Sequence, residues 1–282
     1  MDQPQPSFLT RHEFVIRRLH SLSGLIPVGA YMVVHLVTNA TVLNGPGSFQ
    51  DNVYKIHSLG RFLPIVEWAF IFAPILFHAI VGIWIMVGMN PNTASYPYMA
   101  NRRYTWQRIT GMIAFVFIMW HVFHMHGWFH NQEWLKNVAV PYGGAQFRPF
   151  NAASTAGRAL QNGVVFILYG VGVLSCVFHL ANGIWTMGIT WGVWTSPLAQ
   201  SRALKACAVF GVLMGAIGLG ALGGMRAVGS GDAYNKAVEI ENHMYEGRVK
   251  SGELQPDEEK RTRPMKSDDS MDTMLEEYRN MP

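Results

Sequence analysis

Long apolar stretches separated by polar segments dominate the chain. A helix needs about 20 predominantly apolar residues to cross the hydrocarbon core of a membrane. Pro27 lies inside the first stretch, where it is tolerated if neighbouring helices satisfy the freed backbone groups. The pattern therefore predicts an all-α integral membrane bundle of five transmembrane helices. These are expected at residues 22–43, 62–89, 109–129, 163–189 and 203–224.

The polar segments set the expected domain organisation. Residues 1–21 form a polar lead, 22–226 the five-helix membrane domain, and 227–282 a charged tail with short helical possibilities such as 271–281. Five spans put the two termini on opposite sides of the membrane. Eight Lys and Arg residues lie on the side of the N-terminus and five on the other side. This bias favours a cytoplasmic N-terminus and an extracytoplasmic tail.

Composition narrows the choice of function. Half of the 282 residues are hydrophobic and only 14% are charged, whereas a soluble domain carries about a quarter charged residues. The net charge is only +4 and the arginines cluster at span ends, so no nucleic-acid partner is expected. Cys176 and Cys207 lie in apolar stretches and form no C-x-x-C motif. Neither an iron–sulfur cluster nor a covalently attached haem is therefore predicted.

One histidine lies near the middle of each of the first four stretches. An ionisable side chain at such depth is costly, so it usually faces the bundle interior and has a function. Axial haem ligation can use two imidazoles from different helices at the same depth. Four central histidines therefore suggest two bis-histidine haems. The candidate iron ligands are His35, His78, His121 and His179.

The depth of these histidines predicts how they pair. A helix rises about 1.5 Å per residue. His35 and His121 lie roughly 18–20 Å from the cytoplasmic face, while His78 and His179 lie roughly 24 Å from the outer face. The predicted pairs are thus His35–His121 nearer the outside and His78–His179 nearer the cytoplasm.

Glycines follow two of these histidines by one helical turn. Gly82 follows His78, and Gly183 follows His179. Residues four apart share a helix face, so each glycine is expected to leave room for a flat macrocycle beside the ligand. Glycines also let membrane helices approach closely, and this alternative stays open.

Four segments of the chain resemble a known family. They are RRLHSLSGLIPVG with VVHLV, EWAFIFAPILFHAIVGIWI, QRITGMIAFVFIMWHVF and LSCVFHLANGIWTMGITWGVWTSP, and they cover most of residues 14–226. They resemble the five-helix, di-haem cytochrome b membrane anchor of succinate:quinone oxidoreductases (succinate dehydrogenase or fumarate reductase). The resemblance implies two haem b groups. It assigns His78–His179 to the proximal haem and His35–His121 to the distal haem.

The resemblance also implies a role and partners. A flavoprotein subunit would oxidise succinate or reduce fumarate, and an iron–sulfur subunit would pass electrons to the proximal haem. The distal haem would exchange them with a quinone, expected to be menaquinone. The chain would anchor both subunits in the lipid of a bacterial inner membrane, in a complex that could form homo-oligomers. The dicarboxylate site would lie on a partner, because this sequence has no dinucleotide fingerprint.

Further candidate site residues lie near the ends of the stretches. Glu67, at the outer end of the second stretch, could exchange protons with the quinone, or could be an interfacial carboxylate facing water. Residues at the inner ends of the first and third stretches could bind haem propionates or quinone, since arginine suits carboxylates. Arginines there can equally be topology signals. These inner residues are Arg18, His20, Ser21, Trp106 and Arg108.

Two other functions fit parts of the pattern. A cytochrome b subunit of another respiratory dehydrogenase, such as a hydrogenase or formate dehydrogenase, would also need central histidines. A membrane metal or proton transporter is the alternative outside redox proteins, because His124, His126 and His130 crowd the outer end of the third stretch. The first two continue an H-x-x-H-x-H pattern that begins at His121. No acidic or cysteine residue accompanies them within the stretch, which weakens the transporter hypothesis.

Overall fold

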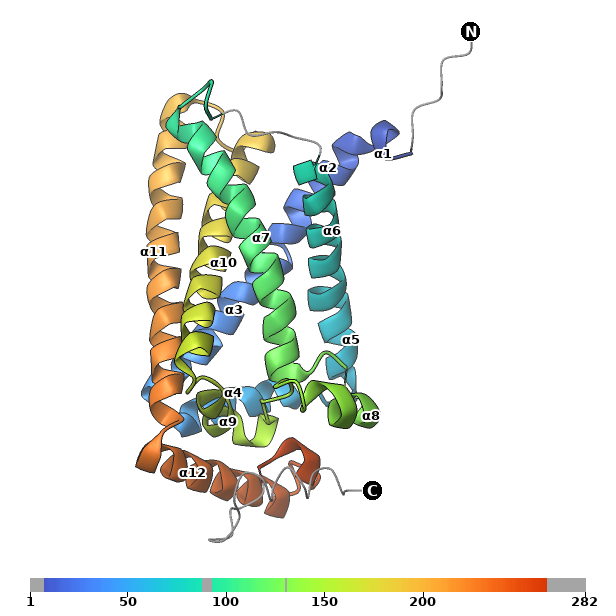
Figure 1. Cartoon of the computed structure of the whole chain (residues 1–282), viewed down its shortest axis with the longest axis vertical. Helices are drawn as coiled ribbons and strands as arrows, with labels where there is room; N and C mark the ends of the chain where they lie inside the picture. The colour runs from blue at the N-terminus through green and yellow to red at the C-terminus, as the bar shows by residue number, and fades with distance from the viewer. Residues whose placement is uncertain (1–7, 88–92, 130, 263–282) are drawn as a thin grey trace. The chain divides into compact units, whose positions relative to one another are not determined.

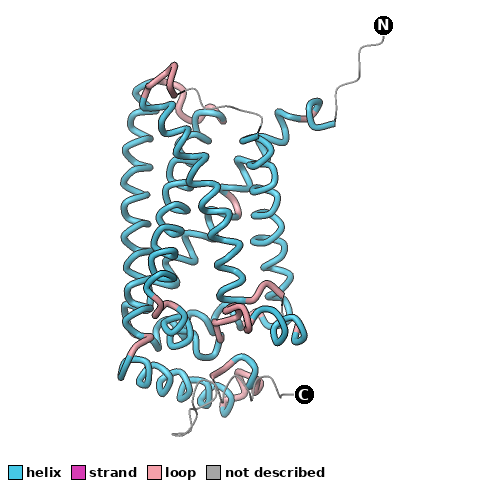
Figure 2. Tube along the Cα trace, in the orientation of Figure 1, coloured by secondary structure: helices cyan, strands magenta, loops and turns pink. Residues whose placement is uncertain are grey.

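The computed structural model describes residues 8–87, 93–129 and 131–262. Every regular element in these ranges is helical, and no strand occurs among them (Figure 2). The α-helices, labelled in Figure 1, are α1 (Phe8–Arg11), α2 (Glu13–Leu25), α3 (Val28–Ala40), α4 (Pro46–His57), α5 (Leu63–Glu67), α6 (Ala73–Val87), α7 (Met99–His126), α8 (Gln132–Trp134), α9 (Ala152–Ala159), α10 (Gly163–Thr190), α11 (Pro197–Val228) and α12 (Gly231–Lys250). The short 3-10 and π-helical segments are η1 (Thr41–Asn44), η2 (Gly60–Phe62), η3 (Trp68–Phe72), η4 (Leu135–Ala139), η5 (Pro149–Asn151) and η6 (Glu258–Lys260).

Within the described residues, five helical segments are long and apolar enough to cross a membrane, which confirms the predicted all-α membrane bundle. Their mean hydropathies range from 1.5 to 2.4. Large apolar side chains are exposed along them, and none of the described residues of α6 is buried. A continuous apolar surface of this kind marks a face that is covered by lipid or protein. The segments are Glu13–Asn44, Gly60–Val87, Met99–His126, Gly163–Thr190 and Pro197–Val228.

The first span begins earlier than predicted and is broken, and the third span also begins earlier, at Met99 instead of residue 109. The first span was expected to begin at residue 22, but α2 begins at Glu13. An ion pair of 2.7 Å joins Glu13 to Arg17 one helical turn later and supports this start. The helix ends at Leu25 and resumes at Val28, because Pro27 has no N–H to donate to the helical hydrogen-bond ladder.

The residues group into two compact units, and each is described by itself. The first unit comprises Met1–Val37, Leu59–Phe115 and Val171–Gly218, and the second comprises Thr38–Ser58, Val116–Gly170 and Leu219–Pro282. The division falls inside α3, α7, α10 and α11, so each of these helices contributes residues to both units. In the first unit, a buried apolar cluster joins α3, α10 and α11 through Leu36, Val177 and Met214.

The second unit contains a larger apolar cluster. Two helices approach closely beside it, because a Cβ atom on Gly157 of α9 would lie only 2.6 Å from the backbone nitrogen of Gly229, just after α11. A side chain at Gly157 would therefore force the two backbones apart. The cluster consists of Val42, Phe49, Val53, Met125, Ala152, Ala153, Ala156, Leu160, Tyr169, Leu222 and Met225.

Helix α9 begins in a buried polar site built by other helices. The first N–H groups of a helix have no partner within it. The N–H of Ala152 donates to Gln50 Oε1 of α4 at 2.8 Å. The N–H groups of Ala153 and Ser154 donate to Glu241 Oε1 of α12 at 2.6 and 3.2 Å. Both acceptor side chains are fully buried. Residues 131–160 are thus tied to the C-terminal segment.

The C-terminal segment holds a longer helix than predicted. Helix α12 has 20 residues, with Ala237, Glu241 and Tyr245 buried at four-residue spacing on one face. Its Arg248 forms an ion pair of 2.7 Å with Asp51 of α4. Residues 231–250 thus form a longer helix than the short helical possibilities predicted for the tail, while the possibility at 271–281 lies outside the described residues.

Candidate functional site

The imidazoles of His78 and His179 lie beside each other in the first unit. Their ring centroids are 6.1 Å apart and the ring planes are inclined at 84°. His78 is carried by α6 and His179 by α10. Two metal–imidazole bonds of about 2 Å each, together with the ring radii, put the centroids about 6 Å apart. The observed separation fits two imidazoles that would bind a single iron.

Backbone carbonyl groups of neighbouring helices orient both rings. His78 Nδ1 lies 2.9 Å from the carbonyl oxygen of His20, and His179 Nδ1 lies 3.0 Å from that of Gln107. A carbonyl oxygen can only accept, so each Nδ1 carries the proton and donates. In the neutral rings Nε2 is then the unprotonated nitrogen, which is the one that can bind a metal.

Two glycines provide the space that these imidazoles occupy. A Cβ atom on Gly111 of α7 would lie 2.7 Å from His179 Cε1, and one on Gly24 of α2 would overlap the His78 ring. Neither ring could take its position beside a larger residue. The requirement supports a packed imidazole pair rather than two rings turned toward lipid.

The glycines singled out from the sequence have different neighbours from those expected. A Cβ atom on Gly82 would meet the His20 ring at 3.1 Å, and one on Gly183 would meet the Gln107 amide at 3.4 Å. These two glycines thus lie beside side chains that contact the imidazoles, because His20 stacks on His78 with centroids 4.1 Å apart. The clearance for a macrocycle at these positions stays a prediction.

The side chain of Gln107 ties α7 to α10 at the level of His179. Its Nε2 donates to the His179 carbonyl at 3.0 Å, and its Oε1 accepts from Asn182 Nδ2 at 2.9 Å. Gln107 and Asn182 were missed in the sequence. The available signal was that each is an uncharged polar residue inside an otherwise apolar span.

The residues predicted at the inner ends of the first and third stretches, called edge residues below, bind helix ends and aromatic side chains. Arg18 donates to the carbonyl of Thr190, the last residue of α10, and Arg108 donates to that of Met86 near the end of α6. Ser21 accepts from Trp191 Nε1 at 2.9 Å. Cations and donors near helix C-termini satisfy the terminal carbonyl groups. These contacts fix the ends of the spans around the imidazole pair.

Arg103 is an edge residue that was not among the predicted site residues. Its guanidinium lies 4.1 Å from the centroid of the Trp185 ring. Its Nε and Nη1 atoms are buried and have no hydrogen-bond partner among the described residues. An arginine with unused donors at a span end is suited to an anionic group.

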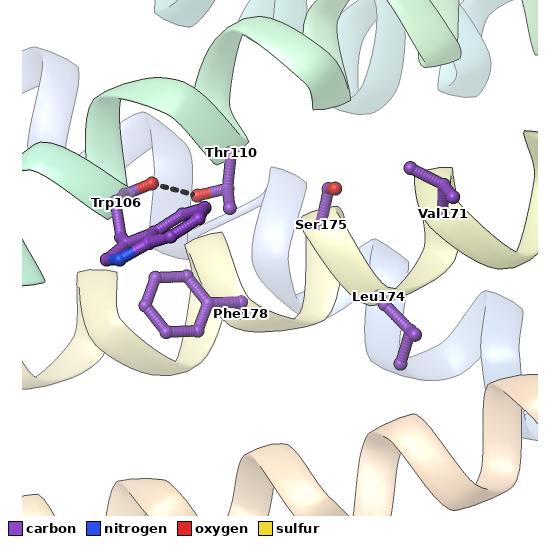
Figure 3. Close-up of a pocket in the computed structure, with 6 residues that line it drawn as sticks. All are labelled: Trp106, Thr110, Val171, Leu174, Ser175 and Phe178. Carbon is purple, nitrogen blue, oxygen red and sulfur yellow. Dashed lines mark hydrogen bonds between the residues drawn. The ribbon is translucent and has the colours of Figure 1, made fainter.

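Trp106 lines an open hollow of about 440 Å³ in the first unit. Figure 3 shows Trp106 and Thr110 of α7 on one side, and Phe178 and Ser175 of α10 on the other. The Thr110 hydroxyl donates to the Trp106 carbonyl at 2.8 Å, so it is already satisfied. The lining is otherwise mainly apolar and suits hydrocarbon better than a charged group.

His35 and Glu67 are both associated with Tyr31. The ring of Tyr31 stacks on His35 with centroids 5.6 Å apart, and Glu67 lies close enough to the Tyr31 phenol to interact with it electrostatically. The three residues come from α3 and α5 in the first unit. His121 belongs to the second unit. The pairing of His35 with His121 therefore stays a prediction.

In the second unit, His121 and His124 share one partner. The hydroxyl of Tyr169 lies 3.1 Å from His121 Nδ1 and 2.8 Å from His124 Nδ1. No group of three His, Cys, Asp or Glu side chains that could hold a metal ion occurs in the described part of the chain. His130, the third histidine of the transporter hypothesis, lies outside that part.

Comparison with known proteins places the chain in a family. No family model matches the sequence. The chain is 33% identical over 210 residues to the succinate dehydrogenase cytochrome b558 subunit of Bacillus subtilis (strain 168). The similarity spans 74% of this chain and 96% of that relative, and it is matched by the five apolar spans of the fold. The chain therefore belongs to the family of succinate dehydrogenase cytochrome b subunits.

Proposed function

We propose that this chain is the membrane anchor and di-haem cytochrome b subunit of a succinate:quinone oxidoreductase. It passes electrons between an iron–sulfur subunit and membrane quinone. The observation that carries the proposal is the imidazole pair of His78 and His179, 6.1 Å apart and each donating from Nδ1 to a backbone carbonyl. Family membership supports haem b as the cofactor.

The residues of the pair have distinct tasks in this proposal. His78 and His179 hold one haem iron through Nε2, while the carbonyl groups of His20 and Gln107 fix the orientation of the rings. His35 and His121 hold the second haem, as the sequence pattern predicts. Each haem, when bound, supplies one-electron transfer.

The edge residues hold the propionate groups in this proposal. Arg103 is the best suited, because two of its buried donors have no partner in the described residues. Arg18 and Arg108 are already bound to helix carbonyl groups and contribute charge at the same membrane edge. His20 and Ser21 position their neighbours, while Trp106 lines the apolar hollow.

Quinone chemistry is assigned to the other end of the first unit's spans. Glu67 would take up or release the quinone protons near Tyr31, whose ring stacks on His35. Menaquinone is the proposed quinone. The excess of Lys and Arg on the N-terminal side supports a cytoplasmic N-terminus in a bacterial inner membrane. Flavoprotein and iron–sulfur subunits would bind that side.

The spectrum of the purified protein tests the proposal. A reduced-minus-oxidised difference spectrum should show b-type haem absorbance, with two haems per chain. Purification through a tag on this chain should bring down a flavoprotein that oxidises succinate or reduces fumarate and an iron–sulfur protein. A chain without b-type absorbance would contradict the cytochrome assignment. Copurification with a hydrogenase or formate dehydrogenase instead would contradict the assigned partner complex.

A further inference from the structure

Tyr169 connects the two histidines of the second unit by hydrogen bonds. Its hydroxyl lies 3.1 Å from His121 Nδ1 and 2.8 Å from His124 Nδ1. Tyr169 is only 5% exposed and His124 only 8%. Buried polar atoms at such sites are rarely left without a partner. The three groups should therefore be arranged so that each donor has an acceptor.

The chemistry of the groups sets the direction of the hydrogen bonds. If Nε2 of His121 binds iron, its Nδ1 carries the proton and can only donate. The Tyr169 oxygen accepts this proton, and its own O–H then donates to His124 Nδ1. With the opposite direction, His121 would need to be an imidazolate. In this series of hydrogen bonds, His121 Nδ1 donates to the Tyr169 hydroxyl, which donates to His124 Nδ1. Each of these three atoms then has a partner.

Aromatic rings hold this hydrogen-bonded series of side chains in one geometry. The ring of Trp120 stacks on His124 with centroids 5.1 Å apart and planes at 12°. Phe117 stacks on His121 with centroids 5.7 Å apart and lies edge-on to Tyr169 at 5.4 Å. Flat rings packed on both histidines restrict their rotation, so the hydrogen bonds are directed rather than averaged over orientations.

We propose that Tyr169 and His124 are positioning residues that lower the reduction potential of the haem bound by His121. The inference rests on the proposed function, because it requires His121 to be an iron ligand. An acceptor for the ligand N–H raises the basicity of the imidazole and favours oxidised iron. By accepting from the Tyr169 hydroxyl, His124 makes that oxygen a better acceptor.

The assignment gives His124 a role that differs from metal transport. His78 and His179 donate to backbone carbonyl groups, which side-chain substitution does not remove. His121 donates to a side chain, and Tyr169→Phe removes the hydroxyl oxygen that is its acceptor. The potential of only one of the two haems should therefore depend on Tyr169.

Redox titration of the complete enzyme complex tests the inference. Tyr169→Phe should retain both haems, raise one midpoint potential and leave the other unchanged. His124→Phe keeps an aromatic ring beside Trp120 and should raise the same potential by less. His124→Gln retains an acceptor and should bring the midpoint potential back toward the wild-type value. Tyr54→Phe is the matched control, since the buried Tyr54 hydroxyl has no hydrogen-bond partner among the described residues, and it should shift neither potential.

The outcomes separate the inference from the proposed function. If His121→Ala loses one haem but Tyr169→Phe and His124→Phe shift no potential, the inference is wrong and the ligand assignment stands. If His121→Ala retains both haems, the ligand assignment itself is wrong. If Tyr169→Phe does not assemble, His124→Phe decides by the presence or absence of the upward shift. Nitrogen NMR should find His124 protonated on Nε2, and protonation on Nδ1 would contradict the proposed direction.

Discussion

A single amide side chain, that of Gln107, ties the His179 segment of α10 into the bundle. It donates to the His179 carbonyl and accepts from Asn182, while the backbone carbonyl of Gln107 accepts from His179 Nδ1. Hydrogen bonds between membrane helices contribute about 0.6 kcal/mol each on average and up to about 1.7 kcal/mol. Two side-chain bonds at one residue can therefore decide how firmly an imidazole is held.

Replacing Gln107 by leucine should loosen His179. Gln107→Leu removes two hydrogen bonds and leaves the Asn182 amide without its partner, so the free energy of unfolding should fall by about 1–2 kcal/mol. One haem should be released at a lower temperature than the other, as followed by absorbance during heating. Thr110→Val is the control, because the Thr110 hydroxyl bonds only within its own helix. Equal losses in both variants would argue against a specific role for Gln107.

The buried carboxyl of Glu241 should make the second unit sensitive to pH. Burial raises the pKa of Glu241 from 4.5 to about 6, although hydrogen bonds from Ser154, Ala153 and Asn151 oppose the shift. Between these values the folded protein binds more protons than the unfolded chain. The free energy of unfolding should therefore fall by about 2 kcal/mol as pH rises from about 4.5 to about 6 and then level off.

Hydrogen exchange of the α12 amides across this pH range checks the prediction, after correction for the intrinsic effect of pH. Glu241→Gln should remove the pH dependence, because glutamine does not titrate. Glu239→Gln should keep it, since Glu239 is an exposed residue of the same helix. Protection that increases with pH in the wild-type protein would contradict the assignment to Glu241.

Removal of helix α12 should affect mainly the segment that it contacts and leave the rest of the fold intact. The helix supplies the acceptor for the Ala153 and Ser154 N–H groups and an ion pair to α4. A chain ending at Ser230 should expose the 130–160 region to proteolysis, because buried donors would lose their partner. The b-type absorbance of the haem assigned to His78 and His179 should persist. Unchanged protease resistance would show that α12 is dispensable for this packing.

The five spans were predictable because uninterrupted apolar composition directly reports a membrane environment. The start of the first span was not, since Arg17 and Arg18 in α2 interrupt the apolar pattern while remaining helical. Helix α12 was missed for a related reason. A buried carboxylate, Glu241, lies in the middle of its buried face, so the expected apolar periodicity is broken.

The candidate site was predictable in part. Central histidines are conspicuous in apolar spans, so His78 and His179 could be named from the sequence and the structure places their rings beside each other. The groups that orient them could not be named. A backbone carbonyl such as that of Gln107 leaves no mark in the sequence, and the contact of Tyr169 with His121 and His124 depends on tertiary packing.

For the whole molecule, the proposed function requires two haems held by two separate histidine pairs. The pair in the first unit has contacts that fit this role, whereas the pairing of His35 with His121 is still a prediction. Membership of the succinate dehydrogenase cytochrome b family is established independently of the pairing. A direct test must therefore determine which histidines share a haem.

Haem content of double variants tests the pairing most directly. The wild-type chain should bind two haems, measured as the ratio of extracted haem b to protein. The variant with both His78→Ala and His179→Ala should retain one haem, because both substitutions affect the same site. The variant with His78→Ala and His121→Ala should retain none, because it damages both sites. Retention of one haem by the second variant and none by the first would contradict the assigned pairs.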